Sequence, residues 1–145
     1  MLQDVDAFHL SVDMLAKQHH NNKIDKVVGI EARGFVFGAA VAYAMNAGFI
    51  IMRKPGKLPY KTIKQSYKLE YGTDEIEIHE DAVKSGDRIL LVDDLLATGG
   101  TMAAAAQLIT KTGGEIVGIS FLIELTFLHG RDKLKGYNIH SVIKY

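Results

Sequence analysis

The hydrophobic and polar positions of this chain predict short buried strands that alternate with helices. Val5, Phe8, Val12 and Leu15 recur at helical spacing, which predicts an amphipathic helix over residues 4–20. Five largely apolar runs rich in β-branched residues predict core strands. These runs are KVVGIEA (26–32), FIIMRK (49–54), RILLVDD (88–94), EIVGISFLIEL (115–125) and NIHSVIKY (138–145).

Helical and turn segments separate these strands. Helices are predicted at FVFGAAVAYAMN (35–46), at TMAAAAQLITKTGG (101–114) and, as a short helix, around LHGRDKL (128–134). Pro55 and Pro59 predict a loop over residues 55–65, and alternation on both sides of Gly72-Thr73-Asp74 predicts a β-hairpin. The pattern therefore indicates one α/β domain over residues 1–145, with a central, mainly parallel sheet flanked by helices and a hairpin beside it.

Composition narrows the function classes. The chain has 145 residues, 48% hydrophobic and 23% charged, with zero formal net charge, so bulk attraction to nucleic acid or to a membrane is not expected. Cysteine is absent, which excludes disulfides and thiolate metal sites. The first residues lack the pattern of a signal peptide, and the longest apolar run, residues 35–45, is too short to span a bilayer. A cytoplasmic protein is expected.

Polar turns follow three of the predicted strands, at residues 31–33, 53–54 and 93–94. Ligands of parallel sheets bind beyond the carboxyl ends of the strands, so we expect the chemistry where these turns meet. Residues 32–69 contain seven basic residues and no acid, whereas residues 70–94 contain nine acids and two bases. This asymmetry is typical of an anion-binding segment beside one that binds hydroxyls or cations, although a solvated surface gives the same pattern.

The stretch RILLVDDLLATGGTMAAAAQ (88–107) carries the most specific signal. Ala97, Thr98, Gly99, Gly100 and Thr101 lie between a strand end and a helix start, where backbone amides and the helix dipole can hold a phosphate. The two carboxylates before this turn, Asp93 and Asp94, suit the vicinal hydroxyls of a ribose. The alternative is an ordinary strand-to-helix turn in which Thr98 caps the helix.

This stretch resembles the phosphoribosyl diphosphate (PRPP) signature of the type I phosphoribosyltransferase family, and DDLLATGGTM is most similar to members that act on adenine. The resemblance extends over almost the whole chain from about residue 25. It also rests on EARGFVFG (31–38), RKPGKLP (53–59), YKLEYGTDEIEIHEDA (67–82) and LIELTFLHGRDKL (122–134). It implies transfer of a 5-phosphoribosyl group from PRPP to adenine, which gives AMP and diphosphate, with Mg²⁺.

The resemblance also implies roles for charged residues in three segments. Arg33 would bind the diphosphate, after a cis peptide bond between Glu31 and Ala32; by spacing alone it is also compatible with a surface cation. Arg53, Lys54 and Lys57 would form a mobile lid over the diphosphate, and the alternative for them is a solvated loop.

The catalytic residue is expected on the hairpin. Glu70 matches the family's catalytic glutamate and would manage a purine proton, an assignment that rests mainly on the resemblance. Leu95, expected in the loop after the acidic pair, would form one apolar wall for the base. The family's N-terminal hood, which supplies the opposite wall, is expected to be missing from this chain. Base specificity therefore does not follow from the residues.

No direct protein ligands for a metal are predicted. The neighbouring His19 and His20 lie at a polar helix end, and His79 lacks the second histidine of a zinc motif, so all three are expected at the surface. Mg²⁺ would arrive with PRPP, held mostly by its diphosphate and ribose oxygens, while Asp93 and Asp94 bind the hydroxyls.

The sequence is compatible with two functional classes. The first class is an enzyme of purine salvage that makes AMP, with hypoxanthine or guanine as alternative bases. The second is a regulatory module that binds PRPP or a nucleotide without catalysis. The lid and Glu70 favour the enzyme.

A homodimer through FVFGAAVAYAM (35–45) is expected, because this helix has few polar positions, although burial in its own core would explain the same pattern.

Overall fold

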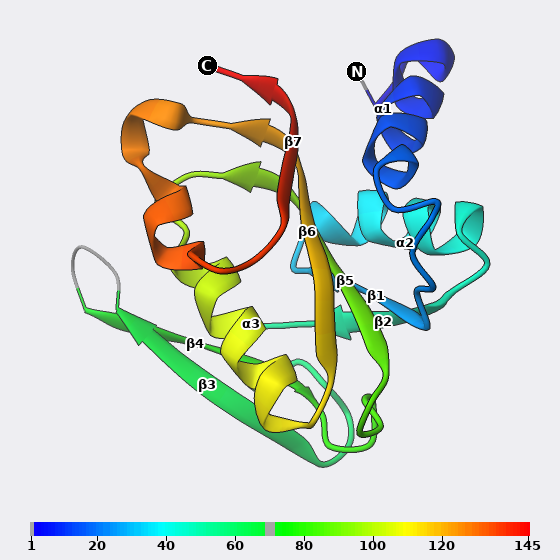
Figure 1. Cartoon of the computed structure of the whole chain (residues 1–145). Coiled ribbons are helices and arrows are strands. Elements are labelled where there is room, and N and C mark those ends of the chain that lie inside the picture. Colours follow the sequence, from blue (N-terminus) through cyan, green and yellow to red (C-terminus); the bar gives the residue numbers. More distant parts are fainter. Residues whose placement is uncertain (1, 69–71) are drawn as a thin grey trace.

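The fold is a five-stranded parallel sheet with a separate antiparallel hairpin, as seen in a computed structural model that describes residues 2–68 and 72–145 (Figure 1). The strands of the main sheet lie in the order β2-β1-β5-β6-β7, and β3 pairs with β4 in the hairpin. The strands are β1 (Lys26–Ile30), β2 (Gly48–Met52), β3 (Thr62–Lys68), β4 (Thr73–His79), β5 (Arg88–Leu96), β6 (Glu115–Glu124) and β7 (Ile139–Lys144). The predicted α/β fold class is therefore confirmed.

Helices cover both faces of the main sheet (Figure 1). Helices α1 (Val5–Lys17) and α2 (Gly34–Ala44) pack on one face, where they share a core with the sheet. Helix α3 (Gly100–Lys111) packs on the other face, and the hairpin lies across it. Two 3-10 helices, η1 (Thr126–Leu128) and η2 (Gly130–Leu134), connect β6 to β7. Within the described part of the chain, no helix combines the length and apolarity needed to cross a membrane.

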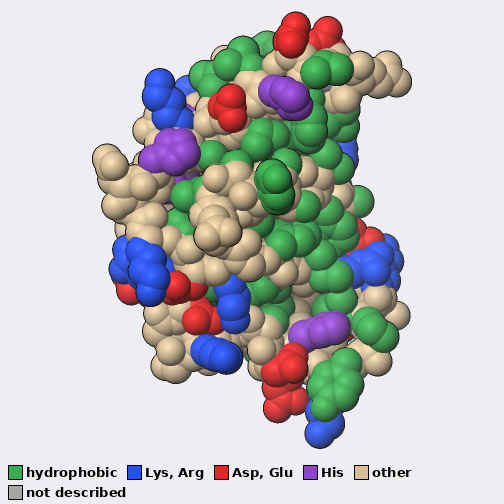
Figure 2. All heavy atoms as spheres, turned by 90° about the vertical axis from the view of Figure 1, so that its right-hand side faces the viewer, with side chains coloured by type: hydrophobic (Ala, Val, Ile, Leu, Met, Phe, Trp, Pro, Cys, Tyr) green, Lys and Arg blue, Asp and Glu red, His purple; other side chains and the backbone are tan. Residues whose placement is uncertain are grey.

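Helix α2 is apolar on both its inner and its outer side. Phe37, Val41 and Ala42 point into the core and are at most 2% exposed. On the outer side Val36 remains 42% exposed and Tyr43 91% exposed. Figure 2 shows hydrophobic side chains gathered over this face of the molecule. Burial in its own core thus explains only half of the apolar pattern of this helix.

The structure corrects three predicted boundaries. Strand β3 begins at Thr62, inside the segment predicted as a loop, because Thr62 pairs with His79 and extends the hairpin. Thr73 and Asp74 belong to β4 and not to the turn, because they pair with Lys68 and Tyr67 of β3. Strand β5 continues beyond the two aspartates to Leu96, because β6 offers it partners along this length.

The prediction that His19 lies at the surface is wrong. Its side chain is fully buried, and its Nε2 lies 2.8 Å from Oγ of Ser120 in β6. Burial lowers the pKa of His19, and His140 nearby adds to this effect. His19 therefore fixes the end of α1 to the sheet as a neutral, hydrogen-bonded core residue.

Candidate functional site

The three polar turns meet at the carboxyl edge of the sheet, as predicted. Strand β1 lies between β2 and β5, so the turn after β1 reaches both neighbours. Arg33 Nε lies 2.7 Å from Asp94 Oδ2, and Arg53 Nη2 lies 3.2 Å from Glu31 Oε1. The peptide bond between Glu31 and Ala32 is cis, as the resemblance leads us to expect. Arg33 and Asp94, which are 61 positions apart in the sequence, thus share one site.

Carboxylates of the chain itself hold the cations of the predicted lid. Glu31 accepts hydrogen bonds from Arg53, from the Lys54 amide at 3.0 Å and from Lys57 Nζ at 2.5 Å. Partial burial opposes ionisation of Glu31, but these three donors outweigh it and lower its pKa to about 2. The Lys54 ammonium pairs with Asp74 on β4. An incoming polyanion would therefore have to exchange with internal carboxylates.

The two aspartates of β5 have unequal environments. Burial raises the pKa of Asp93 well above that of an ordinary aspartate, although the Asp94 amide donates a hydrogen bond to its Oδ1 at 2.9 Å. Asp94 instead carries the ion pair with Arg33. Leu95 follows them within the strand and is half-buried, whereas the sequence had suggested a loop position. The pair therefore offers hydroxyl groups one carboxylate that is ion-paired with Arg33 and one carboxyl whose burial favours protonation.

The predicted phosphate cradle is the start of α3. Gly99 is the N-cap residue, with a left-handed backbone at φ 78°, and no side chain caps the helix. Thr98 is exposed, so the alternative in which it caps the helix is not what the structure shows. The amides of a twelve-residue helix therefore begin at this turn without a side-chain acceptor, which is the arrangement that binds phosphate.

A pocket of about 300 Å³ connects the lid to the cradle. Its lining includes Glu31 and Lys54 from the lid side and Thr101 from the cradle. Two further residues, Tyr67 and Asp74, line it from the hairpin, and the Tyr67 hydroxyl donates to Asp74 Oδ2 at 3.2 Å. These two residues were not predicted as site residues. Asp74 was predicted in the turn, whereas in the structure it pairs with Tyr67 within the hairpin.

The predicted catalytic residue, Glu70, lies outside the described residues. The neighbouring strands of the hairpin are described up to Lys68 and from Thr73, which are paired with each other. The pocket is therefore lined by the same hairpin that carries Glu70 in the sequence.

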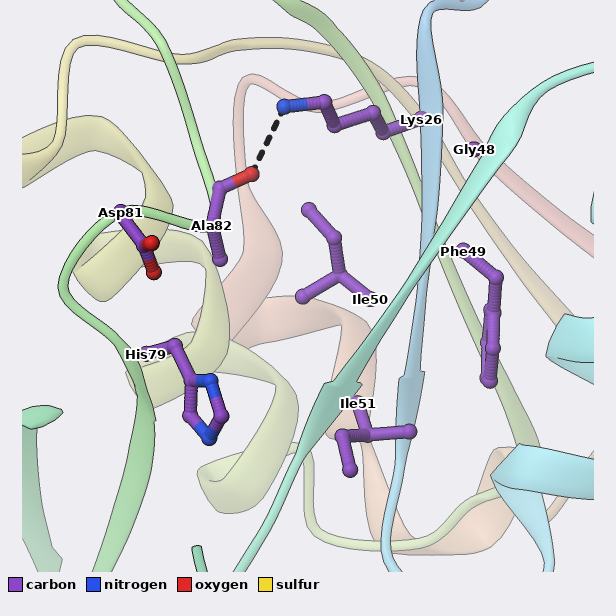
Figure 3. A pocket seen from close by; sticks show the side chains of 8 residues that line it. All are labelled: Lys26, Gly48, Phe49, Ile50, Ile51, His79, Asp81 and Ala82. Atoms are coloured by element: carbon purple, nitrogen blue, oxygen red, sulfur yellow. Dashed lines mark hydrogen bonds between the residues drawn. The ribbon is translucent and has the colours of Figure 1, made fainter. Parts of the chain in front are cut away.

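A second pocket, of about 270 Å³, lies against the edge strand β2 (Figure 3). Its polar lining comprises Lys26, His79 and Asp81. Lys26 is already engaged, because its Nζ donates to the Ala82 carbonyl at 2.7 Å and lies 2.7 Å from Asp87 Oδ2. None of the predicted phosphate-binding or ribose-binding residues lines this pocket, so we assign the chemistry to the first one.

Residues 2–68 and 72–145 contain no group of three or more His, Cys, Asp or Glu side chains that could hold a metal ion. The carboxylate oxygens at the site come from Asp93 and Asp94 on β5 and from Glu31 and Asp74, which line the pocket. Carboxylate oxygens suit Mg²⁺, which usually keeps several of its ligands from water and substrate phosphates. The donor set therefore fits a Mg²⁺ ion that a phosphorylated substrate brings with it.

A parallel sheet with an uncapped helix start, an acidic pair and a cation-rich loop at one edge is the arrangement expected of a protein that handles phosphorylated ribose. The chain belongs to the phosphoribosyl transferase domain family, whose pattern matches residues 1–139. Its relatives in sequence and in structure carry a more specific name, adenine phosphoribosyltransferase.

One curated relative of that name, from Christiangramia forsetii, is 59% identical over all 145 residues, which correspond to 85% of the relative. A crystal structure of adenine phosphoribosyltransferase from Thermoanaerobacter pseudethanolicus is 55% identical and matches with a TM-score of 0.97, over 99% of this chain and 84% of that one. The Saccharomyces cerevisiae enzyme, crystallised with an imino-altritol bisphosphate and adenine, is 37% identical, with a TM-score of 0.91 over 97% of this chain and 82% of that one.

Proposed function

We propose that the chain transfers the 5-phosphoribosyl group of PRPP to adenine, giving AMP and diphosphate in purine salvage. The observation that carries this proposal is the contact between the Arg33 turn and Asp94, which places an anion-binding turn beside the ribose-type acidic pair. The names of the relatives support adenine over hypoxanthine or guanine, and they lend no support to a regulatory module without catalysis.

The geometry suggests one orientation for PRPP. Its 5-phosphate would bind the amides of residues 97–101, and its ribose hydroxyls would bind Asp93 and Asp94. The diphosphate would then face Arg33 and the lid cations, since these lie at the neighbouring strand ends. Adenine would lie against Leu95, within the reach of the hairpin.

In the reaction, the bond between C1′ and the diphosphate oxygen breaks and the bond between C1′ and purine N9 forms. Arg33, Arg53, Lys54 and Lys57 would stabilise the negative charge that develops on the leaving diphosphate. Glu70 would accept the proton that adenine loses as N9 becomes bonded to carbon. The lid would also keep water from the cationic ribose.

Without substrate, the cations of the lid form ion pairs within the chain. Glu31 pairs with Arg53 and Lys57, and Asp74 pairs with Lys54, at the rim of the pocket. The negatively charged diphosphate of PRPP would compete for these cations, so lid closure would be an exchange of ion-pair partners.

The proposal also includes a cytoplasmic location, in keeping with a composition that lacks cysteine.

Mg²⁺ belongs to the proposal as a companion of PRPP. When bound, it would neutralise part of the diphosphate charge. Asp93 and Asp94 would hold the ribose hydroxyls beside it and orient C1′ toward the base. Of the two, Asp94 is the better acceptor, because burial raises the pKa of Asp93.

We also propose a homodimer through the outer side of α2. Val36 and Tyr43 lie on this side, and Phe49 and Ile51 on the neighbouring strand β2 are each 37% exposed. A contiguous apolar face of this kind is typical of a protein interface. Sedimentation at micromolar concentration should show a dimer for the parent chain, and Tyr43→Glu should weaken it. A parent chain that sediments as a monomer would refute the dimer.

A coupled assay of diphosphate release tests the function, with PRPP and Mg²⁺ and each base in turn. We expect release with adenine and little with hypoxanthine or guanine. Release with another purine but not with adenine would reassign the base. PRPP binding without release for any base would favour the regulatory alternative.

A further inference from the structure

We propose that Arg131 is a positioning residue for the 5-phosphate cradle: paired with Glu124, it holds η2 against residues 97–101 and so sets the shape of the turn. The inference rests on the proposed role of this turn in binding the 5-phosphate. It adds η2, which lies about thirty residues after the turn in the chain, to the phosphate-binding site. Neither the motif at residues 88–107 nor the family name assigns η2 to phosphate binding.

The cradle and η2 are in direct backbone contact. A Cβ atom added to Gly99 would lie 2.3 Å from the carbonyl oxygen of Gly130. Conversely, a Cβ atom added to Gly130 would lie 2.3 Å from the carbonyl oxygen of Ala97 and 2.8 Å from a methyl carbon of Leu96. The two distances of 2.3 Å to carbonyl oxygens are far below van der Waals contact, so only glycine fits at either position. The two segments therefore determine each other's backbone path.

Arg131 fixes η2 to the sheet by four hydrogen bonds. Its Nε and Nη2 atoms donate to the two carboxylate oxygens of Glu124 at 2.7 and 2.8 Å, which is a bidentate ion pair. Its Nη2 also donates to Ser141 Oγ at 3.2 Å, and its Nη1 to the Ile139 carbonyl at 3.3 Å. One side chain thus connects η2 to both β6 and β7.

Glu124 joins this anchor to the base of the cradle. It is only 4% exposed, and the hydrogen bonds from Arg131 lower its pKa, so it carries its charge inside the protein. In the sheet, Glu124 is in register with Leu96, the last residue of β5 before the cradle, and Leu125 N donates to the Leu96 carbonyl at 2.9 Å. The strand that leads into the cradle and the segment that packs on it are therefore held by the same ion pair.

A phosphate cradle made of backbone amides depends on such support. Its binding strength comes from amides that converge on one point, and the turn itself has no side-chain cap to fix it. Gly99 is conformationally permissive, so the contact with Gly130 is what limits the turn to one shape. Loss of the anchor should loosen the cradle without touching the cations at the ends of β1 and β2.

The inference therefore predicts a selective loss of affinity. Arg131→Met combined with Glu124→Gln removes the ion pair without leaving a buried unpaired charge. We expect this variant to bind AMP and ribose 5-phosphate about tenfold more weakly and diphosphate within about twofold of the parent, by titration calorimetry. The KM for PRPP should rise by a similar factor, with kcat changed less.

Two further variants make the test decisive. Ser141→Ala removes only one hydrogen bond from Arg131 and keeps the ion pair, so it tests the inference even if the double variant does not fold. This variant should weaken AMP binding about twofold. Arg88→Met is the matched control, because the ion pair of Arg88 with Glu115, at 3.0 Å, lies at the opposite end of β5. This control should leave both ligand affinities unchanged.

The outcomes separate the inference from the function on which it rests. A parent chain that binds neither ribose 5-phosphate nor diphosphate would overturn the proposed function. A parent that binds both, with variants that lose both ligands equally or lose neither, would overturn the positioning role alone. Weaker binding of AMP and ribose 5-phosphate with diphosphate affinity retained would establish it.

Discussion

The two regions proposed to bind anions are built in opposite ways. The cradle at residues 97–101 has no charged side chain and depends on backbone amides, on the left-handed Gly99 and on its contact with Gly130. The region around the lid depends on Arg33, Arg53, Lys54 and Lys57, each of which is paired with a carboxylate of the chain.

This difference determines how each region can respond to a ligand. A site made of backbone amides binds an anion in a fixed shape and needs no change of partner. A site made of paired side chains must give up internal ion pairs, which lets the diphosphate enter and leave. We infer that the cradle holds the 5-phosphate throughout the reaction, while the lid follows the leaving group. The predictions below test this division.

The largest effect is expected at Glu70, the proposed catalytic residue. Glu70→Gln should lower kcat by roughly two to four orders of magnitude, because the variant side chain cannot accept the purine proton. PRPP affinity should change little, since the hairpin is not part of the cradle. Single-turnover kinetics and PRPP titration measure the two quantities. A kcat within a few-fold of the parent, combined with lost PRPP binding, would show that Glu70 is a binding residue.

A large effect on binding is expected in the cradle. Gly99→Val places a β-branched residue at φ 78° and against the Gly130 carbonyl, so AMP affinity should fall by about a hundredfold. Gly86→Val is the control: Gly86 also has a positive φ, 85°, but nothing lies within 4 Å of its added Cβ. Titration calorimetry with AMP and a thermal melt of each variant separate lost binding from lost stability. Equal AMP affinities for the two variants would contradict the account.

A moderate, salt-dependent effect is expected at the lid. Lys57→Ala should raise the apparent KM for PRPP by about tenfold, and the difference from the parent should shrink at high salt, because charge attraction is screened. Lys61→Ala removes an exposed lysine from the same basic segment and serves as the control. Initial rates over a range of salt concentrations give the result. An effect of Lys57→Ala that is independent of salt would indicate a role in shape instead.

The smallest effect concerns Glu31 and is a change in stability with pH. Its pKa in the folded chain is about 2, below the ordinary value of 4.5, so its interactions stabilise the fold fully above about pH 4.5. This contribution is lost as the pH falls toward 2. Glu31→Gln should therefore melt a few degrees lower at neutral pH, and its melting temperature should fall less steeply in acid than that of the parent. Parallel curves for the two proteins would contradict the assignment.

The two regions also differ in how far the sequence predicts them. The cradle is encoded locally, because a buried strand, two acids and a glycine turn are consecutive from Arg88 to Thr101. The sheet and its helices follow in the same way from apolar runs of the right length. The order of the strands then brings Arg33 to Asp94, as the three polar turns predict.

The interactions that the sequence did not reveal are non-local. Ser120, which bonds His19, is 101 residues away in the chain, so the burial of this histidine has no local signal. The start of β3 at Thr62 was hidden by the two prolines, which mark only the first part of the loop. The sequence contains one indication of the Arg131–Glu124 pair, namely a carboxylate at the end of a largely apolar strand.

A crystal structure of the chain with AMP, diphosphate and Mg²⁺ tests the central claim most directly. We expect the 5-phosphate of AMP within hydrogen-bond distance of the amides of residues 98–101, and the diphosphate beside Arg33 and the lid cations, with Lys57 released from Glu31. A phosphate group bound elsewhere, such as beside Lys26 and His79 in the pocket along β2, would contradict this assignment of the two regions.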